Sequence, residues 1–166
     1  MNAVKTIGLA VFGFWIYEDF IRPAQKNKRS MNGLGALKKY KWQPPYIGNK
    51  LTLNAYKGKS GVYLIRKGEK VVYVGYSGYN LYETIRRHFN EWNLNNKPYR
   101  NFYSHKGYEV RVILCTPAQA AKLEKVLILK YNPKDNELKY ENYQFGAKDT
   151  AVWEKYKFAT DEEPPF

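Results

Sequence analysis

Glu124 is the residue whose type and setting most directly suggest chemistry in this chain. It stands among apolar residues of a stretch with helical spacing, between Leu123 and Leu127, so its carboxylate projects from near the edge of a buried face. A carboxylate there should be paired or should bind a metal ion, because a buried unpaired charge is costly. Glu124 is therefore a candidate ligand for one Mg²⁺ (or Mn²⁺), a cation able to neutralise charge on a phosphate during hydrolysis. The alternative is an ordinary surface glutamate paired with a lysine four residues on, but position 128 is Ile128.

The helix that must carry Glu124 has clear signals at both ends. Thr116 and Gln119 form a capping box around Pro117, which suits the first helical position. The helix is predicted to run to about Tyr131 and to stop before Pro133. Its apolar stripe consists of Ala120, Ala121, Leu123, Leu127 and Ile128.

Three apolar segments predict strands. Residues 62–66 and 71–76 are joined by a glycine-containing turn, 67–70, and together they predict a hairpin. Residues 109–115 predict a third strand, central and largely buried. The strand ends at Cys115, the only cysteine, which excludes an intramolecular disulfide and argues against a cysteine-based zinc site.

A second helix is predicted between the hairpin and the third strand. Asn80 is its candidate cap, and it runs from Leu81 to Trp92 with Ile85 and Phe89 on the buried face. Residues 93–99 predict a loop. The chain is thus predicted to be α+β, with a small three-stranded mixed or antiparallel sheet flanked by helices.

The two ends of the chain differ from this central part. Residues 1–22 predict an N-terminal apolar helix, residues 23–50 a basic connector, residues 51–140 the compact domain and residues 141–166 a C-terminal extension with a loosely ordered end. The connector is a candidate arm for DNA or phospholipid, with a solvated linker as the alternative. Its basic residues are Lys26, Lys28, Arg29, Lys38, Lys39 and Lys41.

The N-terminal helix leaves three roles open. The apolar run over residues 7–17 spans only about 16 Å as a helix, whereas a bilayer core needs ~20 residues. Extending the run brings in Lys5, Glu18 and Asp19. The helix is expected to lie at a membrane surface or dock on a partner protein, to span a membrane, or to pack on its own domain.

The charge balance indicates an anionic partner. The formal net charge is +13, from 28 Lys and Arg against 15 Asp and Glu. A balance this basic favours nucleic acid first and an anionic membrane second, but it carries no information on catalysis.

Several short motifs follow one another in a fixed order along residues 60–137. Two tyrosine triplets, at 61–63 and 73–75, are followed by a helical histidine and then by a helix with Glu-x-x-Leu-Ile. The ordered set resembles the GIY-YIG endonuclease family and implies its nuclease fold for residues 51–140. The matching residues are Tyr63, Tyr73, His88, Glu124, Leu127, Ile128, Tyr131, Pro133 and Asn136.

The resemblance implies a role for each matched side chain. Tyr63 would contact the attacking water, and either Tyr63 or His88 would relay its proton. Tyr73 would orient the phosphate or the water, Glu124 would hold the metal, and Asn136 would brace the site. The alternative for the two tyrosines is cross-strand packing.

One family residue is missing. The family has an arginine one turn before the histidine, where this chain has Thr84, which cannot neutralise a phosphate. On a helical wheel Arg87 shares the flank of Thr84 and His88, whereas Arg86 points away. Arg87 is therefore the candidate substitute, and a solvated basic face is the alternative for both arginines.

The resemblance implies a metal-dependent endonuclease that acts on DNA. The alternative is a catalytically impaired module of the same fold, which binds DNA or serves a structural role and docks on a membrane through residues 1–22. The expected setting is intracellular, in a phage or mobile element, with virion association or membrane association as further expectations.

Overall fold

The computed structural model describes residues 37–165, apart from 49, 91, 95–96, 100–102 and 137–138. The described residues belong to one compact unit, Gly35–Phe166. The predicted helix over residues 1–22 lies outside them, as do Lys26, Lys28 and Arg29 of the connector. Within the described part of the chain, no helix is long and apolar enough to cross a membrane.

The predicted hairpin is confirmed and forms one side of the sheet. Strands β4 (Gly61–Lys67) and β5 (Lys70–Ser77) pair antiparallel, with Tyr63 opposite Gly75. Gly68 has a φ of 58°, which the tight turn requires and which glycine adopts without strain. The register shifts between Ile65 and Arg66, and this irregularity marks a bulge.

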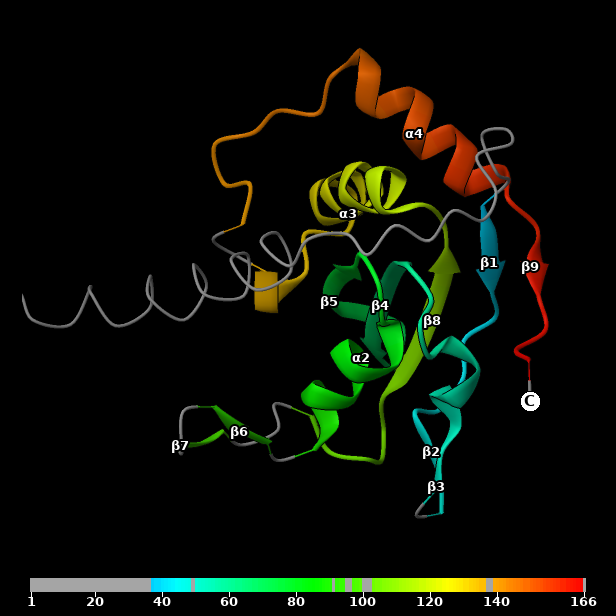
Figure 1. The fold of residues 1–166 in the computed structure, drawn as a ribbon. Coiled ribbons are helices and arrows are strands. Elements are labelled where there is room, and N and C mark those ends of the chain that lie inside the picture. Colours follow the sequence, from blue (N-terminus) through cyan, green and yellow to red (C-terminus); the bar gives the residue numbers. More distant parts are fainter. Residues whose placement is uncertain are drawn as a thin grey trace, which may run out of the picture. The chain divides into compact units, whose positions relative to one another are not determined.

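The sheet contains five strands in the order β5-β4-β8-β1-β9 (Figure 1). Strand β8 (Glu109–Leu114) pairs antiparallel with β4 and is central, as predicted. The short strands β1 (Lys38–Tyr40) and β9 (Asp161–Glu162) extend the sheet beyond β8. Because β9 runs parallel to β1, the sheet is mixed and larger than the predicted three strands.

Tertiary contacts explain why β1 and β9 escaped prediction. Each strand is too short to show a period, and each carries charged residues that normally favour solvent. Lys39 is nevertheless buried, because its ammonium bonds the backbone oxygen of Tyr156 at 3.3 Å and pairs with Asp161 at 3.4 Å. Lys39 therefore belongs to the sheet and not to an exposed arm. The expectation of a loosely ordered C-terminal end is also wrong for β9, which pairs with β1.

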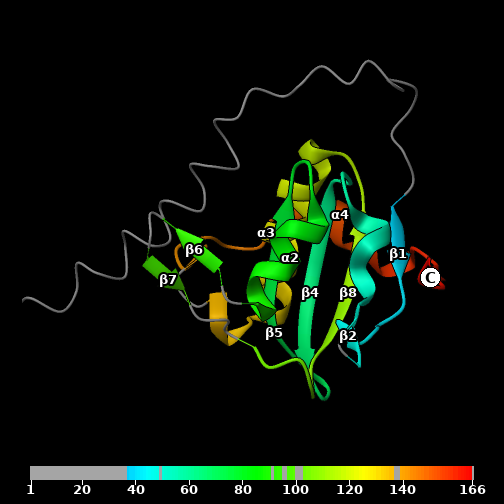
Figure 2. The same ribbon diagram turned by 60° about the horizontal axis from the view of Figure 1, so that its bottom comes forward.

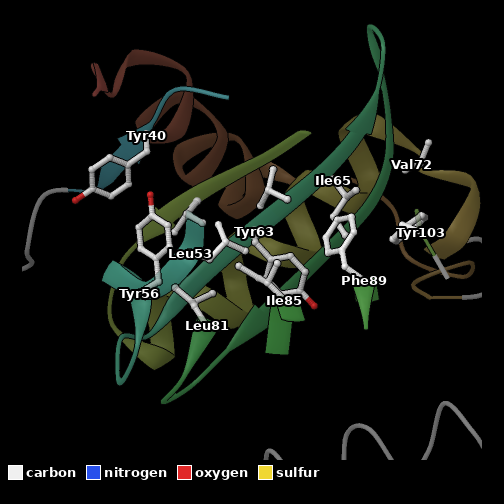
Figure 3. Close-up of a cluster of buried hydrophobic side chains, with 12 residues drawn as sticks. Tyr40, Leu53, Tyr56, Tyr63, Ile65, Val72, Leu81, Ile85, Phe89 and Tyr103 are labelled. Atoms are coloured by element: carbon white, nitrogen blue, oxygen red, sulfur yellow. The ribbon is translucent and has the colours of Figure 1, made fainter. Parts of the chain in front are cut away.

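Helices cover both faces of the sheet (Figures 1 and 2). Helix α2 (Leu81–Phe89) and the short helix η1 (Thr52–Tyr56) pack on one face, where Figure 3 shows Tyr63 beside Ile85. Helices α3 (Pro117–Tyr131) and α4 (Ala147–Phe158) contribute to the core on the other face. The capping box of α3 is present as predicted, and Asn132 ends the helix in a left-handed conformation.

Helix α2 ends earlier than its apolar spacing predicts. It stops at Phe89 because Asn90 is extended and its side-chain oxygen accepts a 2.6 Å hydrogen bond from Tyr46. Strand β6 (Trp92–Leu94) then pairs with β7 (Lys97–Tyr99), where a loop was expected. Three further short elements complete the fold: β2 (Tyr46–Ile47), β3 (Lys50–Leu51) and η2 (Lys134–Asn136).

Candidate active site

Gly75 allows the two tyrosines of the triplets to meet on the α2 face of the sheet. A Cβ at Gly75 would lie 2.5 Å from the hydroxyl oxygen of Tyr63 and 2.8 Å from the Tyr73 ring. Any side chain there would collide with both rings, so glycine is needed for Tyr63 to lie across β5. The two ring centroids are 6.0 Å apart.

His88 joins this pair from helix α2. Its Nε2 lies 2.7 Å from the Tyr63 hydroxyl oxygen, and its ring centroid is 4.5 Å from that of Tyr73. Tyr63 and His88 are buried, whereas Tyr73 is partly exposed. The three side chains form what we call the tyrosine–histidine cluster, and Tyr73 is its member nearest to solvent.

The environment of His88 keeps its ring neutral. Burial, and to a smaller extent the positive charge of Arg87, lowers the pKa of His88 to about 3. The imidazole is therefore unprotonated at neutral pH. In the tautomer with its proton on Nδ1, Nε2 accepts a hydrogen bond from Tyr63.

The two arginines of α2 differ in their surroundings. Arg86 makes an ion pair with Glu83 on its own helix at 2.8 Å, at a partly exposed position. Arg87 lies near enough to His88 for its charge to act on the imidazole.

Thr84 is buried, and it stands where the resemblance to the GIY-YIG family leads us to expect an arginine. Its exposed fraction is 6%, and its hydroxyl donates to the backbone oxygen of Asn80 at 3.1 Å. Thr84 thus satisfies a backbone group of its own helix and supplies no charge to the cluster.

Asn136 holds the edge strand that carries Tyr73 and Gly75. Its side-chain oxygen accepts from the backbone nitrogen of Val74 at 2.8 Å, and its side-chain nitrogen donates to the Val74 oxygen at 2.9 Å. The buried amide therefore takes the hydrogen bonds that a further strand would make at Val74, which lies on the edge strand β5.

Glu124 lies in a second group, which we call the Glu124 group. Its exposed fraction is 2%, and Lys139 donates to its Oε1 at 2.8 Å. Tyr140 donates to Oε2 at 3.4 Å, and burial followed by the charge of Glu124 raises the pKa of Tyr140. The carboxylate is thus buried and paired, as its place on the helix predicts.

The two groups lie against opposite faces of the sheet. Tyr63 and Tyr73 belong to the core packed around α2, whereas Leu123 and Leu127, the apolar neighbours of Glu124 on α3, belong to the other core. Strand β5 is common to both groups, because Tyr73 faces α2 while Tyr76 faces α3 near the ammonium of Lys139. The structure therefore brings three of the predicted site residues into direct contact and places the carboxylate across the edge strand.

The donor chemistry of Glu124 suits Mg²⁺, although it supplies only one protein ligand. Mg²⁺ prefers oxygen and commonly keeps several waters beside one or two carboxylates. Oε1 already has the Lys139 ammonium as its counterion, and a metal bound there would have to displace it. No cluster of three or more acidic, histidine or cysteine side chains suited to a metal occurs among the described residues.

Sequence reasoning missed three residues next to the predicted ones. Lys139 and Tyr140 contact Glu124, and Tyr103 has its ring centroid 5.9 Å from that of His88. None of them lies in a regular pattern, so only the folded chain reveals them.

Comparisons with protein-family models, with curated proteins and with solved structures find no match to this chain.

Proposed function

We propose that this protein is a GIY-YIG-type endonuclease that hydrolyses DNA phosphodiester bonds with a single Mg²⁺ or Mn²⁺. The observation that carries the proposal is the buried 2.7 Å contact between Tyr63 and His88, with the Tyr73 ring against the same imidazole. Three elements, β4, β5 and α2, converge to make it. A tyrosine hydroxyl held in this way is suited to orienting a water.

The low pKa of His88 assigns different parts to the two side chains. An imidazole with a pKa of about 3 is able to accept a hydrogen bond at neutral pH in its Nδ1-protonated tautomer, yet it is a weak base. His88 is therefore suited to holding the Tyr63 hydroxyl in place, with the Tyr63 oxygen facing the attacking water. Tyr73, partly exposed, is the side chain available to orient the phosphate.

In this proposal the phosphate would have to lie across the edge strand β5, because its charge would be met from both faces of the sheet. Glu124 would hold the metal ion, whose chemistry when bound is to neutralise charge at the phosphate. Arg87 would take over the part of the arginine that Thr84 replaces, because its charge already acts on His88. A charged guanidinium also fits phosphate oxygens better than a hydroxyl does.

Plasmid cleavage tests the proposal. The protein should cut DNA with Mg²⁺ and not with EDTA, and Glu124→Gln should reduce the rate by about 100-fold or more, since a metal supplies several kcal/mol. Glu154→Gln is the matched control, because Glu154 is a half-exposed carboxylate on α4 that contacts Lys157 at 3.9 Å. Wild-type cleavage rates in folded Glu124→Gln would contradict the metal role.

A second candidate is a DNA-binding module of the same fold without activity. Two observations favour it: Thr84 is uncharged, and the Glu124 carboxylate already has the Lys139 ammonium as a counterion. Under this candidate the protein binds DNA but does not cut it with Mg²⁺ or Mn²⁺. The same plasmid assay, combined with a DNA-binding measurement, separates the two functions.

A further inference from the structure

A short hydrogen bond between Tyr103 and Asp135 lies beside the tyrosine–histidine cluster. The Tyr103 hydroxyl donates to Oδ2 of Asp135 at 2.6 Å. Tyr103 is buried, so its hydroxyl needs an acceptor, and a carboxylate provides a stronger one than a neutral group. The bond joins residues 32 positions apart in sequence.

Tyr103 in turn supports His88 from two directions. Its backbone nitrogen donates to the His88 backbone oxygen at 3.1 Å. Its ring centroid lies 5.9 Å from that of His88 and 5.8 Å from that of Phe89. The position of Tyr103 therefore bears on the position of the imidazole that contacts Tyr63.

Asp135 is also adjacent to the residue that holds the opposite side of the cluster. Asn136, the next residue in the short helix η2, makes both hydrogen bonds to Val74 beside Tyr73. The short helix η2 thus contacts both sides of the cluster. Asn136 holds the backbone of β5, and Asp135 holds Tyr103, which contacts His88. Movement of this turn would change the distance between the Tyr73 and His88 rings.

We propose that Asp135 is a positioning residue of the active site, which sets the place of His88 against Tyr63 and Tyr73 through the Tyr103 hydroxyl. This inference rests on the proposed nuclease function for its effect on rate, but not for its effect on the imidazole. Asp135 does not touch the reacting groups in this arrangement, and it acts only through Tyr103. A misplacement of about 1 Å in a site can reduce a rate by about 100-fold.

Two variants test the inference, and both remove the same hydrogen bond. Asp135→Ala removes the acceptor, and Tyr103→Phe removes only the donor hydroxyl while keeping the ring. Asp149→Asn is the control, because Asp149 bonds the backbone of Gly146 at the start of α4, away from the cluster. NMR of the histidine ring nitrogens, without DNA, reports on His88 directly, and a His105→Gln variant assigns the second of the two histidines.

We expect both variants to shift the His88 ring signals, and the control to leave them unchanged. Cleavage should show kcat reduced about 10-fold to 100-fold with KM for DNA within about two-fold. The double variant should lose no more than either single variant, because both act through one bond. Asp135→Asn, which keeps an oxygen acceptor, should restore part of the rate.

Unchanged His88 signals in folded Tyr103→Phe would overturn the inference, whatever the rate. If the wild-type protein cuts no DNA, the proposed function fails, and the NMR comparison still decides whether Asp135 positions His88. The two failures are therefore distinguishable.

Discussion

At the scale of single residues, the neutral imidazole of His88 organises the candidate site. Its burial keeps it unprotonated, so it adds no second positive charge beside Arg87, and its Nε2 lies 2.7 Å from the Tyr63 hydroxyl oxygen. Thr84, one turn earlier, satisfies only its own helix. Arg87 is the basic residue of this helix whose charge contributes to the lowered pKa of His88.

We predict that Arg87→Ala slows DNA cleavage far more than Arg86→Ala. Loss of a charge-assisted contact in a site shielded from water typically costs about 100-fold to 1,000-fold in kcat. Arg86 is instead paired with Glu83 at a partly exposed position, where such pairs contribute little. Single-turnover cleavage rates of the two variants provide the measurement, and equal, mild effects would exclude Arg87 as the substitute arginine.

At the scale of elements, β5 is an edge strand, and side chains take the place of a further strand on its outer side. Asn136 bonds both backbone groups of Val74, and Gly75 leaves space for the Tyr63 ring. The same strand carries Tyr73 toward one face and Tyr76 toward the other. β5 is thus the element through which the tyrosine–histidine cluster and the Glu124 group are connected.

We predict that Gly75→Ala destabilises the fold and moves Tyr63 away from His88. The new methyl group would lie 2.5 Å from the Tyr63 hydroxyl oxygen, and such overpacking typically costs about 1–3 kcal/mol. Gly78→Ala is the control, since its nearest neighbour would be Pro117 at 3.9 Å. Urea unfolding measures the difference, and equal stability of the two variants would contradict the steric argument.

At the scale of the whole molecule, the net charge of +13 exceeds what the candidate site needs. Several lysines form ion pairs within the fold, as Lys39 does with Asp161 and Lys139 with Glu124. Others, such as Lys38 and Lys59, are exposed. The surplus is suited to contacts with a polyanion that do not depend on sequence.

We predict that DNA binding weakens steeply as salt rises and that Glu124→Gln leaves this dependence unchanged. Each phosphate neutralised on a duplex adds about 0.9 to the slope of log affinity against log salt. Fluorescence anisotropy with a labelled duplex at several salt concentrations measures the slope. A flat response would show that the basic surface serves another partner.

The sequence by itself was enough for the elements whose signals are local. The hairpin of β4 and β5, the central strand β8 and the capped helix α3 follow from alternation, turn residues and a capping box. Each of these patterns is contained in one segment of the chain, so no distant contact is needed to read it. The place of Glu124 beside the buried face of α3 followed in the same way from its apolar neighbours.

Only the tertiary structure decided features that depend on partners far apart in the chain. Helix α2 ends at Phe89 because Asn90 meets Tyr46, and β9 joins β1 because Lys39 pairs with Asp161. The pairing of Glu124 with Lys139 and its place across β5 from His88 also required the folded chain. Such contacts leave no period in the sequence, since their free energy comes from groups that only folding brings together.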